Sequence, residues 1–241
     1  EGHAAFIGIE RIRDLVTHKK LSFSEALEVI RSSSLFTTHT PVPAGHDAFP
    51  ESMIRQYMSH YPDVLGITWE QYINLGKTNP NDPNEKFSMS VLACNLSQEV
   101  NGVSWLHGEV SKDILGSMWP GYFKNELHIG YVTNGVHFPT WIATSMRRLY
   151  ARYFADGFEG HTYDIPAWQK VHQIPDEELW NERMYLKNKL VKHIRRRYSD
   201  PNQVRLDSPR QMIQIIEGIK PDVLTIGFAR RFATYKRAHL L

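Results

Sequence analysis

Four positive charges near the end of the chain are the residues best suited to binding an anion. They follow an apolar run, 222–228, and fall within one window of eight residues: Arg230, Arg231, Lys236 and Arg237. We expect the run to form a buried strand and a helix to begin near Ala233, whose free N–H groups would point at the same place. Arginine offers a bidentate fork and lysine a point charge, so the segment predicts a phosphate site. A basic loop with solvated side chains is the alternative.

A second candidate segment combines histidines with prolines and spans residues 36–47. His39 ends a β-prone run that two prolines stop, because proline cannot donate to a strand ladder. A histidine so placed could line a cleft and hydrogen-bond a sugar hydroxyl. His39, His46 and Asp47 are also metal-ligating residue types, but their spacing matches no standard metal site, and we predict none. A purely structural loop stays open.

Asparagine–glycine pairs mark two further segments. Asn134-Gly135 closes an expected strand over 127–133, and the pair is first of all a turn signal. The Asn134 amide carries both donors and an acceptor, which suits a pair of sugar hydroxyls. Asn101-Gly102 is interpreted as a turn before a helix over 103–115, and His107 on that helix as a packing residue.

The chain opens with Glu1-Gly2-His3-Ala4-Ala5, without a methionine. Gly2 would allow a close approach of backbone, and His3 would lie in the first turn of a helix over about 4–17; a capped helix start is the alternative. The chain ends at Leu241, inside the last expected helix. Because both ends look cut, we expect an internal fragment of a longer protein.

Local signals predict the elements that must position these residues. Ser22 with Glu25, and Thr68 with Gln71, form capping-box patterns that open helices. After residue 139 the pattern is mostly helical, with helices expected over 141–154 and 175–198. The last of these begins acidic and ends basic, as the helix dipole favours. Its basic end is interpreted as solvated, because no aromatic ladder or nucleic-acid motif accompanies it.

Composition places the chain among globular proteins. It has 28 basic and 26 acidic residues and a net charge of +2, which gives no strong argument for nucleic acid or an anionic membrane. No apolar run reaches the roughly 18 residues that a membrane span needs. A single cysteine, Cys94, excludes an intrachain disulfide and fits a reducing, cytoplasmic setting.

Taken together and in their order along the chain, the five segments resemble the α-glucan (glycogen, starch, maltodextrin) phosphorylases over essentially the whole chain. The forms Glu-Gly-His-Ala-Ala and Thr-His-Thr-Pro-Val-Pro are closest to the shorter bacterial and archaeal type. The resemblance implies an α/β fold of the GT-B glycosyltransferase architecture, with two domains facing across a cleft. We therefore expect a helix-rich, partial GT-B arrangement of two incomplete domains meeting at the catalytic cleft: 1–137 from the end of the first domain and 138–241 from the start of the second, cofactor-binding domain. Helices lacking their sheet should expose apolar surface.

The resemblance also implies roles for five residues. Arg231 and Lys236 match the positions that bind the substrate phosphate, although Ala233-Thr234 stands where the animal enzymes have His-Glu. His39 matches the histidine that contacts the donor glucose and whose carbonyl faces the reacting carbon; Thr38 precedes it where many relatives have asparagine. Asn134 matches the asparagine that binds the same glucose. His3 matches a position on the acceptor side of the cleft.

The implied reaction is phosphorolysis with retention, which converts glucan and phosphate into glucose 1-phosphate and a shorter glucan. A carbonyl dipole such as that of His39 would stabilise the oxocarbenium character of the leaving glycosyl. Arg231 and Lys236 would screen the repulsion between substrate phosphate and the phosphate of pyridoxal phosphate, which serves as proton donor and acceptor. The lysine that holds this cofactor in the family lies beyond Leu241. We therefore expect these residues alone neither to bind pyridoxal phosphate covalently nor to catalyse.

Two other functions stay open at this point. One is a sugar-nucleotide glucan synthase of the same architecture, and the other is a non-catalytic carbohydrate-binding module with aromatic platforms such as Trp105, Trp119 or Trp141. We find no carboxylate pair that would suit ordinary glycoside hydrolysis. The expected partners are α-1,4-glucan or maltodextrin and phosphate, without nucleic acid or membrane. A homo-oligomer is left open.

Overall fold

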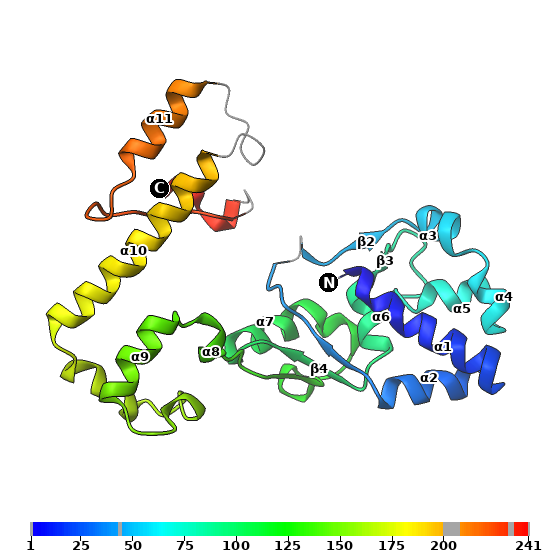
Figure 1. Cartoon of the computed structure of the whole chain (residues 1–241). Helices are drawn as coiled ribbons and strands as arrows, with labels where there is room; N and C mark the ends of the chain where they lie inside the picture. The colour runs from blue at the N-terminus through cyan, green and yellow to red at the C-terminus, as the bar shows by residue number, and fades with distance from the viewer. Residues whose placement is uncertain (1, 43–44, 200–207, 231–233, 241) are drawn as a thin grey trace. The chain divides into compact units, whose positions relative to one another are not determined.

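The computed structural model describes residues 2–42, 45–199, 208–230 and 234–240 (Figure 1). The chain divides into two compact units, Glu1–Gly135 and Val136–Leu241. The first is an α/β unit and the second is helical in its described residues. The helix-rich α/β part of the predicted fold is thus confirmed, whereas the GT-B arrangement of two domains stays a prediction.

The first unit begins with short and long helices in the expected places. A 3₁₀ turn, Gly2–Ala5, leads into α1, Phe6–Lys19, and α2 follows at Phe23–Ser32. The predicted capping box at Ser22 is present: the Ser22 hydroxyl accepts from the Glu25 amide at 3.3 Å, and Glu25 accepts from the Ser22 amide at 2.8 Å. A second predicted capping box opens α5, Trp69–Asn74, at Thr68. The remaining α-helices among the described residues of this unit are α3, Glu51–Met58; α4, Tyr61–Leu65; α6, Met89–Asn95; and α7, Trp105–Leu115.

Helices α1 to α6 bury the larger of two apolar clusters described in this unit, and the smaller one joins Cys94 and Leu115 to the strand residues Val100 and Ile129. Ile9 and Ile12 of α1 are 1% and 0% exposed, and both face α2 and α6 through a shared cluster. Stacked aromatic rings extend the cluster, with Tyr72 and Phe87 at 6.4 Å between ring centroids. The buried members of this core are Ile9, Ile12, Ala26, Ile30, Ile54, Leu65, Tyr72, Ile73, Phe87, Met89, Leu92 and Leu96.

A three-stranded parallel sheet is the framework of the first unit. Its strands are β1, Leu35–Thr37; β4, Glu99–Gly102; and β5, Ile129–Tyr131, in the order β1-β4-β5. Thr37 pairs with Asn101, and Asn101 pairs with Gly130. A small antiparallel pair, β2 (Ala48–Phe49) with β3 (Phe87–Ser88), ties the loop after β1 to the start of α6.

The interpretation of Asn101-Gly102 as a turn is wrong, because both residues belong to β4, the central strand. Partners on both sides hold this segment extended, and Thr37 Oγ1 donates to Asn101 Oδ1 at 3.0 Å. The side-chain nitrogen of Asn101, Nδ2, donates in turn to the Gly102 carbonyl at 3.1 Å. Because the Asn101 side chain already forms hydrogen bonds within the sheet, it does not compete for the local backbone bonds that would favour a turn.

The second unit packs a small aromatic core. The helix predicted over 141–154 is confirmed as α9, Thr144–Tyr153, which begins three residues later than expected. A separate short helix, α8 (Phe138–Trp141), precedes it, and extended backbone at Ile142 and Ala143 divides the two. Two 3₁₀ segments, Phe158–Gly160 and Pro166–Gln173, then fold back onto α9. Rings meet edge to face or tilted around Phe158, which lies 4.2 Å from Phe154 and 4.9 Å from Trp168 between centroids.

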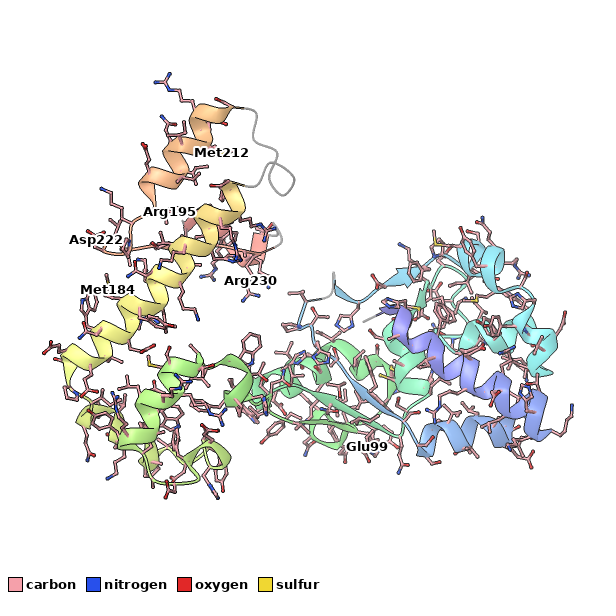
Figure 2. All side chains as sticks on the ribbon, viewed as in Figure 1. Glu99, Met184, Arg195, Met212, Asp222 and Arg230 are labelled. Atoms are coloured by element: carbon pink, nitrogen blue, oxygen red, sulfur yellow. The ribbon has the colours of Figure 1, made fainter. Side chains whose placement is uncertain are left out.

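The long helix predicted over 175–198 is confirmed as α10, Asp176–Tyr198, and α11, Pro209–Gly218, packs beside it. Arg195 of α10 (labelled in Figure 2) donates to the carbonyls of Ile216 at 3.1 Å and Ile219 at 2.9 Å. It therefore satisfies orphan carbonyls at the end of α11. The basic end of this helix was predicted to be solvated, but Arg195 instead links α10 to α11.

The strand predicted over 222–228 is not formed. Leu224 and Ile226 are 84% and 70% exposed, and the second unit has no other strand among its described residues with which this segment could pair. A strand needs hydrogen-bonding partners, which an apolar run cannot supply for itself. The helix expected near Ala233 is replaced, in the described residues, by 3₁₀ turns at Thr234–Lys236 and Ala238–Leu240.

Among the described helices, none combines the length and the apolar character that crossing a bilayer requires.

Candidate active site at the carboxyl edge of the parallel sheet

Two of the predicted site residues lie on loops that leave the same edge of the sheet. All three strands are parallel, so their carboxyl ends face one way: His39 follows β1, Val103 follows β4 and Asn134 follows β5. β1 and β5 flank β4, and two strand spacings amount to about 10 Å. This edge is where open parallel sheets place their binding residues.

Backbone hydrogen bonds continue the ladder beyond the strands and draw these loops together. The Thr38 amide donates to the Asn101 carbonyl at 3.0 Å, and the Val132 amide donates to the Gly102 carbonyl at 3.0 Å. One step further, the Asn134 amide donates to the Val103 carbonyl at 3.1 Å. The backbone of Asn134 is therefore fixed to the loop after β4, while its side chain is exposed.

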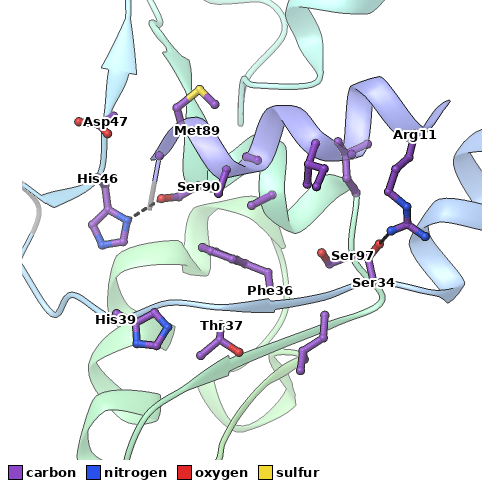
Figure 3. A pocket seen from close by; sticks show the side chains of 18 of the residues that line it. Arg11, Ser34, Phe36, Thr37, His39, His46, Asp47, Met89, Ser90 and Ser97 are labelled. Carbon is purple, nitrogen blue, oxygen red and sulfur yellow. Dashed lines mark hydrogen bonds between the residues drawn. The ribbon is translucent and has the colours of Figure 1, made fainter. Parts of the chain in front are cut away.

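His39 lines a cavity of about 510 Å³ between α1, β1, the loop after β1 and α6 (Figure 3). Figure 3 shows Thr37 and His39 at the end of β1, with His46 above them. Hydroxyl, guanidinium, imidazole and carboxylate groups make up the polar part of the lining, and these groups suit a ligand rich in hydroxyls. The polar lining residues are Arg11, Ser33, Ser34, Thr37, His39, His46, Asp47, Ser90 and Ser97.

His46 anchors the loop that carries His39. Its Nε2 lies 3.2 Å from the Thr40 carbonyl, and its Nδ1 lies 2.6 Å from Ser90 Oγ (Figure 3). A carbonyl only accepts, so Nε2 carries a proton and, in the neutral ring, Nδ1 accepts from the serine hydroxyl. Both ring nitrogens are thus engaged within the protein. No group of three or more His, Cys, Asp or Glu gathers in metal-binding range among the described residues.

Gly2 fits closely against the other end of this loop. A Cβ at Gly2 would lie 2.2 Å from Asp47 Oδ2, so a side chain at this position would require the Asp47 carboxylate to move. The Asp47 carbonyl accepts from the Met89 amide at 2.9 Å, which joins the loop to α6. His3 lies next to Gly2 in the 3₁₀ turn and is exposed, and the cavity is lined by its neighbours Gly2 and Ala4.

Two buried polar groups near the strand ends were missed or undervalued by the sequence reasoning. Thr38 is 1% exposed and its hydroxyl has no hydrogen-bond partner among the described residues. His107, interpreted as a packing residue, is 7% exposed and its Nδ1 accepts from the Val103 amide at 3.1 Å. The signal that could have identified His107 was its place three residues after Ser104, where a capping box carries an acceptor.

The predicted phosphate-binding residues belong to the second unit. Lys236 is half-buried in the 3₁₀ turn Thr234–Lys236, and Arg230 is exposed. Arg231, the other predicted phosphate ligand, lies outside the described residues, as do Phe232 and Ala233 of the same motif.

Comparison with known proteins identifies the family to which these segments belong. The sequence profile described as carbohydrate phosphorylase matches residues 1–226. The chain is a member of the carbohydrate phosphorylase family. The resemblance drawn from the five segments is therefore confirmed.

Three curated relatives show how much of a phosphorylase these residues represent. A glycogen phosphorylase of Mycobacterium tuberculosis is 42% identical over 247 residues, which cover 100% of this chain and 28% of the relative. A glycogen phosphorylase of Aquifex aeolicus is 40% identical and a maltodextrin phosphorylase of Thermococcus litoralis 37% identical, each over 100% of this chain. The chain spans 34% and 27% of the lengths of these two relatives.

Proposed function

We propose that these residues form part of an α-glucan phosphorylase, which cleaves α-1,4-glucan with phosphate and releases glucose 1-phosphate with retention. The observation that carries the proposal is the family match along nearly the whole chain, combined with His39 and Asn134 on loops at one edge of a parallel sheet. The named relatives are glycogen and maltodextrin phosphorylases. The activity belongs to a protein of their length rather than to these residues alone.

We propose the GT-B architecture for that longer protein, with 1–137 from the end of its first domain and 138–241 from the start of its second. The division of the chain between Gly135 and Val136 supports this assignment. So does the exposed apolar segment 222–228, which has the composition of a buried strand and would gain partners in a larger sheet.

In the proposed reaction, His39 and Asn134 hold the donor glucose. The side-chain carboxamide of the exposed residue Asn134 would donate to one hydroxyl and accept from another, while the fixed backbone of the loop keeps it in place. The His39 carbonyl would face the reacting carbon and stabilise its developing positive charge through its dipole. His3 would lie on the acceptor side. Arg231 and Lys236 would hold the phosphate, to which arginine offers a fork and lysine a point charge.

The family resemblance implies pyridoxal phosphate, and we propose that none of the described lysines binds it covalently. Lys77 is the one lysine that is buried among them, and its Nζ is engaged with the Asp82 carbonyl at 3.4 Å and Glu51 at 4.0 Å. It does not line the cavity beside His39. We therefore propose that residues outside this chain hold the cofactor.

The test is phosphorolysis by the longest gene product that contains these residues. Maltodextrin and inorganic phosphate are supplied, and glucose 1-phosphate is measured together with its anomeric configuration. We expect α-glucose 1-phosphate from the parent protein and a rate about five- to thirtyfold lower for Asn134→Ala, since loss of a hydrogen bond to substrate costs about 1–2 kcal/mol. His39→Ala should lower the rate as well, through lost contact with the glucose.

Matched controls separate the site from the surface of the same unit. Asn125 and His128 are exposed residues that precede β5 in the sequence, whereas Asn134 follows it. Asn125→Ala and His128→Gln should leave the rate within twofold of the parent. A product that binds maltodextrin without releasing glucose 1-phosphate would contradict the proposal and favour a carbohydrate-binding module.

A further inference from the structure

His107 holds an unusual place at the start of α7. It is the third residue of the helix, its amide donates to the hydroxyl of the N-cap residue Ser104 at 3.2 Å, and its ring folds back to accept from the Val103 amide at 3.1 Å. Because a backbone amide only donates, Nδ1 is the acceptor and the proton of the neutral ring lies on Nε2. The two bonds resemble a capping box in which histidine replaces glutamate and reaches one residue further back.

The residue that His107 holds is also the residue that holds Asn134. Val103 donates its amide to His107 Nδ1, and its carbonyl accepts from the Asn134 amide at 3.1 Å. The imidazole, the Val103 backbone and the Asn134 backbone therefore form a continuous chain of hydrogen bonds. His107 is 7% exposed, so water does not readily replace its ring at the Val103 amide.

We infer that His107 is a positioning residue for Asn134, acting through the backbone of Val103. If the acceptor at Nδ1 is removed, the Val103 amide is left without its partner and the loop after β4 is free to shift. The carbonyl that fixes Asn134 then shifts with it. This inference extends the proposed function, because the consequence for catalysis depends on Asn134 binding the donor glucose.

Two substitutions distinguish the two ring nitrogens of His107. The side-chain oxygen of asparagine is attached to Cγ, as Nδ1 is in histidine, so His107→Asn keeps an acceptor near the Nδ1 position. The oxygen and nitrogen of glutamine lie one atom further out, near the Nε2 position. A positioning role through Nδ1 therefore predicts that asparagine rescues and glutamine does not.

The first readout does not depend on activity. Hydrogen exchange of the Asn134 amide is followed in the parent protein, His107→Asn, His107→Gln and Ser111→Ala. Ser111→Ala is the matched control, because it removes a hydrogen bond to the His107 carbonyl (2.7 Å) within α7 and leaves Nδ1 in place. We expect exchange about tenfold faster in the glutamine variant, from loss of roughly one hydrogen bond, and within threefold of the parent in the other two.

The second readout is the KM for glucose 1-phosphate in the direction of glucan synthesis, in a double-mutant cycle with Asn134→Ala. His107→Gln should raise this KM about fivefold in the parent background and less than twofold when Asn134 is already alanine. Equal exchange in the asparagine and glutamine variants, rescue by glutamine alone, or an undiminished effect of His107→Gln in the Asn134→Ala background would each overturn the inference. An inactive parent protein would refute the proposed function, and the exchange measurement would still decide the role of His107.

Discussion

The close packing of α7 on the end of β4 makes Gly102 a sensitive position. A Cβ at Gly102 would lie 2.7 Å from the Gly108 amide nitrogen and 2.9 Å from the His107 carbonyl carbon. Both atoms are backbone atoms of the helix, so no side chain can rotate away to make room. Gly102→Ala must push the start of α7 off the sheet, together with the loop that carries Val103.

The expected loss of stability follows from two opposing effects. Overpacking against rigid neighbours costs about 1–3 kcal/mol. Replacing glycine restricts the unfolded chain and returns roughly 0.4–1 kcal/mol where the backbone geometry allows it. We therefore expect Gly102→Ala to lower the free energy of unfolding of the first unit by about 1–2 kcal/mol. With a denaturant dependence of about 1–3 kcal/mol per molar urea, the midpoint should fall by roughly 1 M.

Gly130 provides the matched control, since it pairs with Asn101 in the neighbouring strand and a Cβ there would meet nothing within 4 Å. Urea unfolding followed by circular dichroism gives the stability, and hydrogen exchange of peptides from β4 and α7 locates the change. Gly130→Ala should be neutral or slightly stabilising. If Gly102→Ala unfolded within 0.5 kcal/mol of Gly130→Ala, the close approach of α7 to β4 would be refuted.

Three further predictions concern the same unit. Ser22→Ala should cost α2 about 1 kcal/mol through loss of the cap, measured by thermal unfolding, while Ser24→Ala, two residues further along, should cost less than half as much. Burial raises the pKa of the Cys94 thiol to about 12, so a thiol reagent at pH 8 should modify it only as fast as the protein opens; rapid modification of the native protein would contradict its burial. Burial pushes the pKa of Glu85 up, but hydrogen bonds from the Thr78 hydroxyl and amide and the Asn79 amide outweigh it and hold the pKa below the ordinary value. The stability that ionised Glu85 contributes is thus present above its unfolded pKa of about 4.3 and lost as the pH falls through the folded pKa. The difference in unfolding free energy between the parent and Glu85→Gln should therefore shrink from pH 7 to pH 3, and a constant difference would show that ionised Glu85 is not the stabilising form.

Helices of this protein were predictable because their hydrogen bonds are local. The Ser22 and Thr68 capping boxes and the acidic start of α10 each involve residues within one turn, and all three are present in the structure. The short helix α8 was not predicted, and extended backbone at Ile142 and Ala143 separates it from α9.

Strands were less predictable because their partners are remote in the sequence. Asn101-Gly102 has the composition of a turn, yet pairing with Thr37, 64 residues away, makes it the central strand. The apolar run 222–228 has the composition of a buried strand, yet it stays exposed without a partner strand among the described residues of its unit. In both cases the outcome depends on whether a neighbour is available to form hydrogen bonds, and local residue types do not contain that information.

The sequence by itself determined the family, because five short motifs in a fixed order specify residue types that chemistry requires: histidine, asparagine and clustered cations. Only the tertiary structure decided which of these residues lie at the same edge of the sheet. Parallel pairing of β1, β4 and β5 gathers the loops of His39 and Asn134 at one edge, and it brings His107 within hydrogen-bonding distance of the backbone that fixes Asn134. Directions of strands, and therefore of the loops that leave them, are set by hydrogen bonds between distant segments, and these form only when the chain folds.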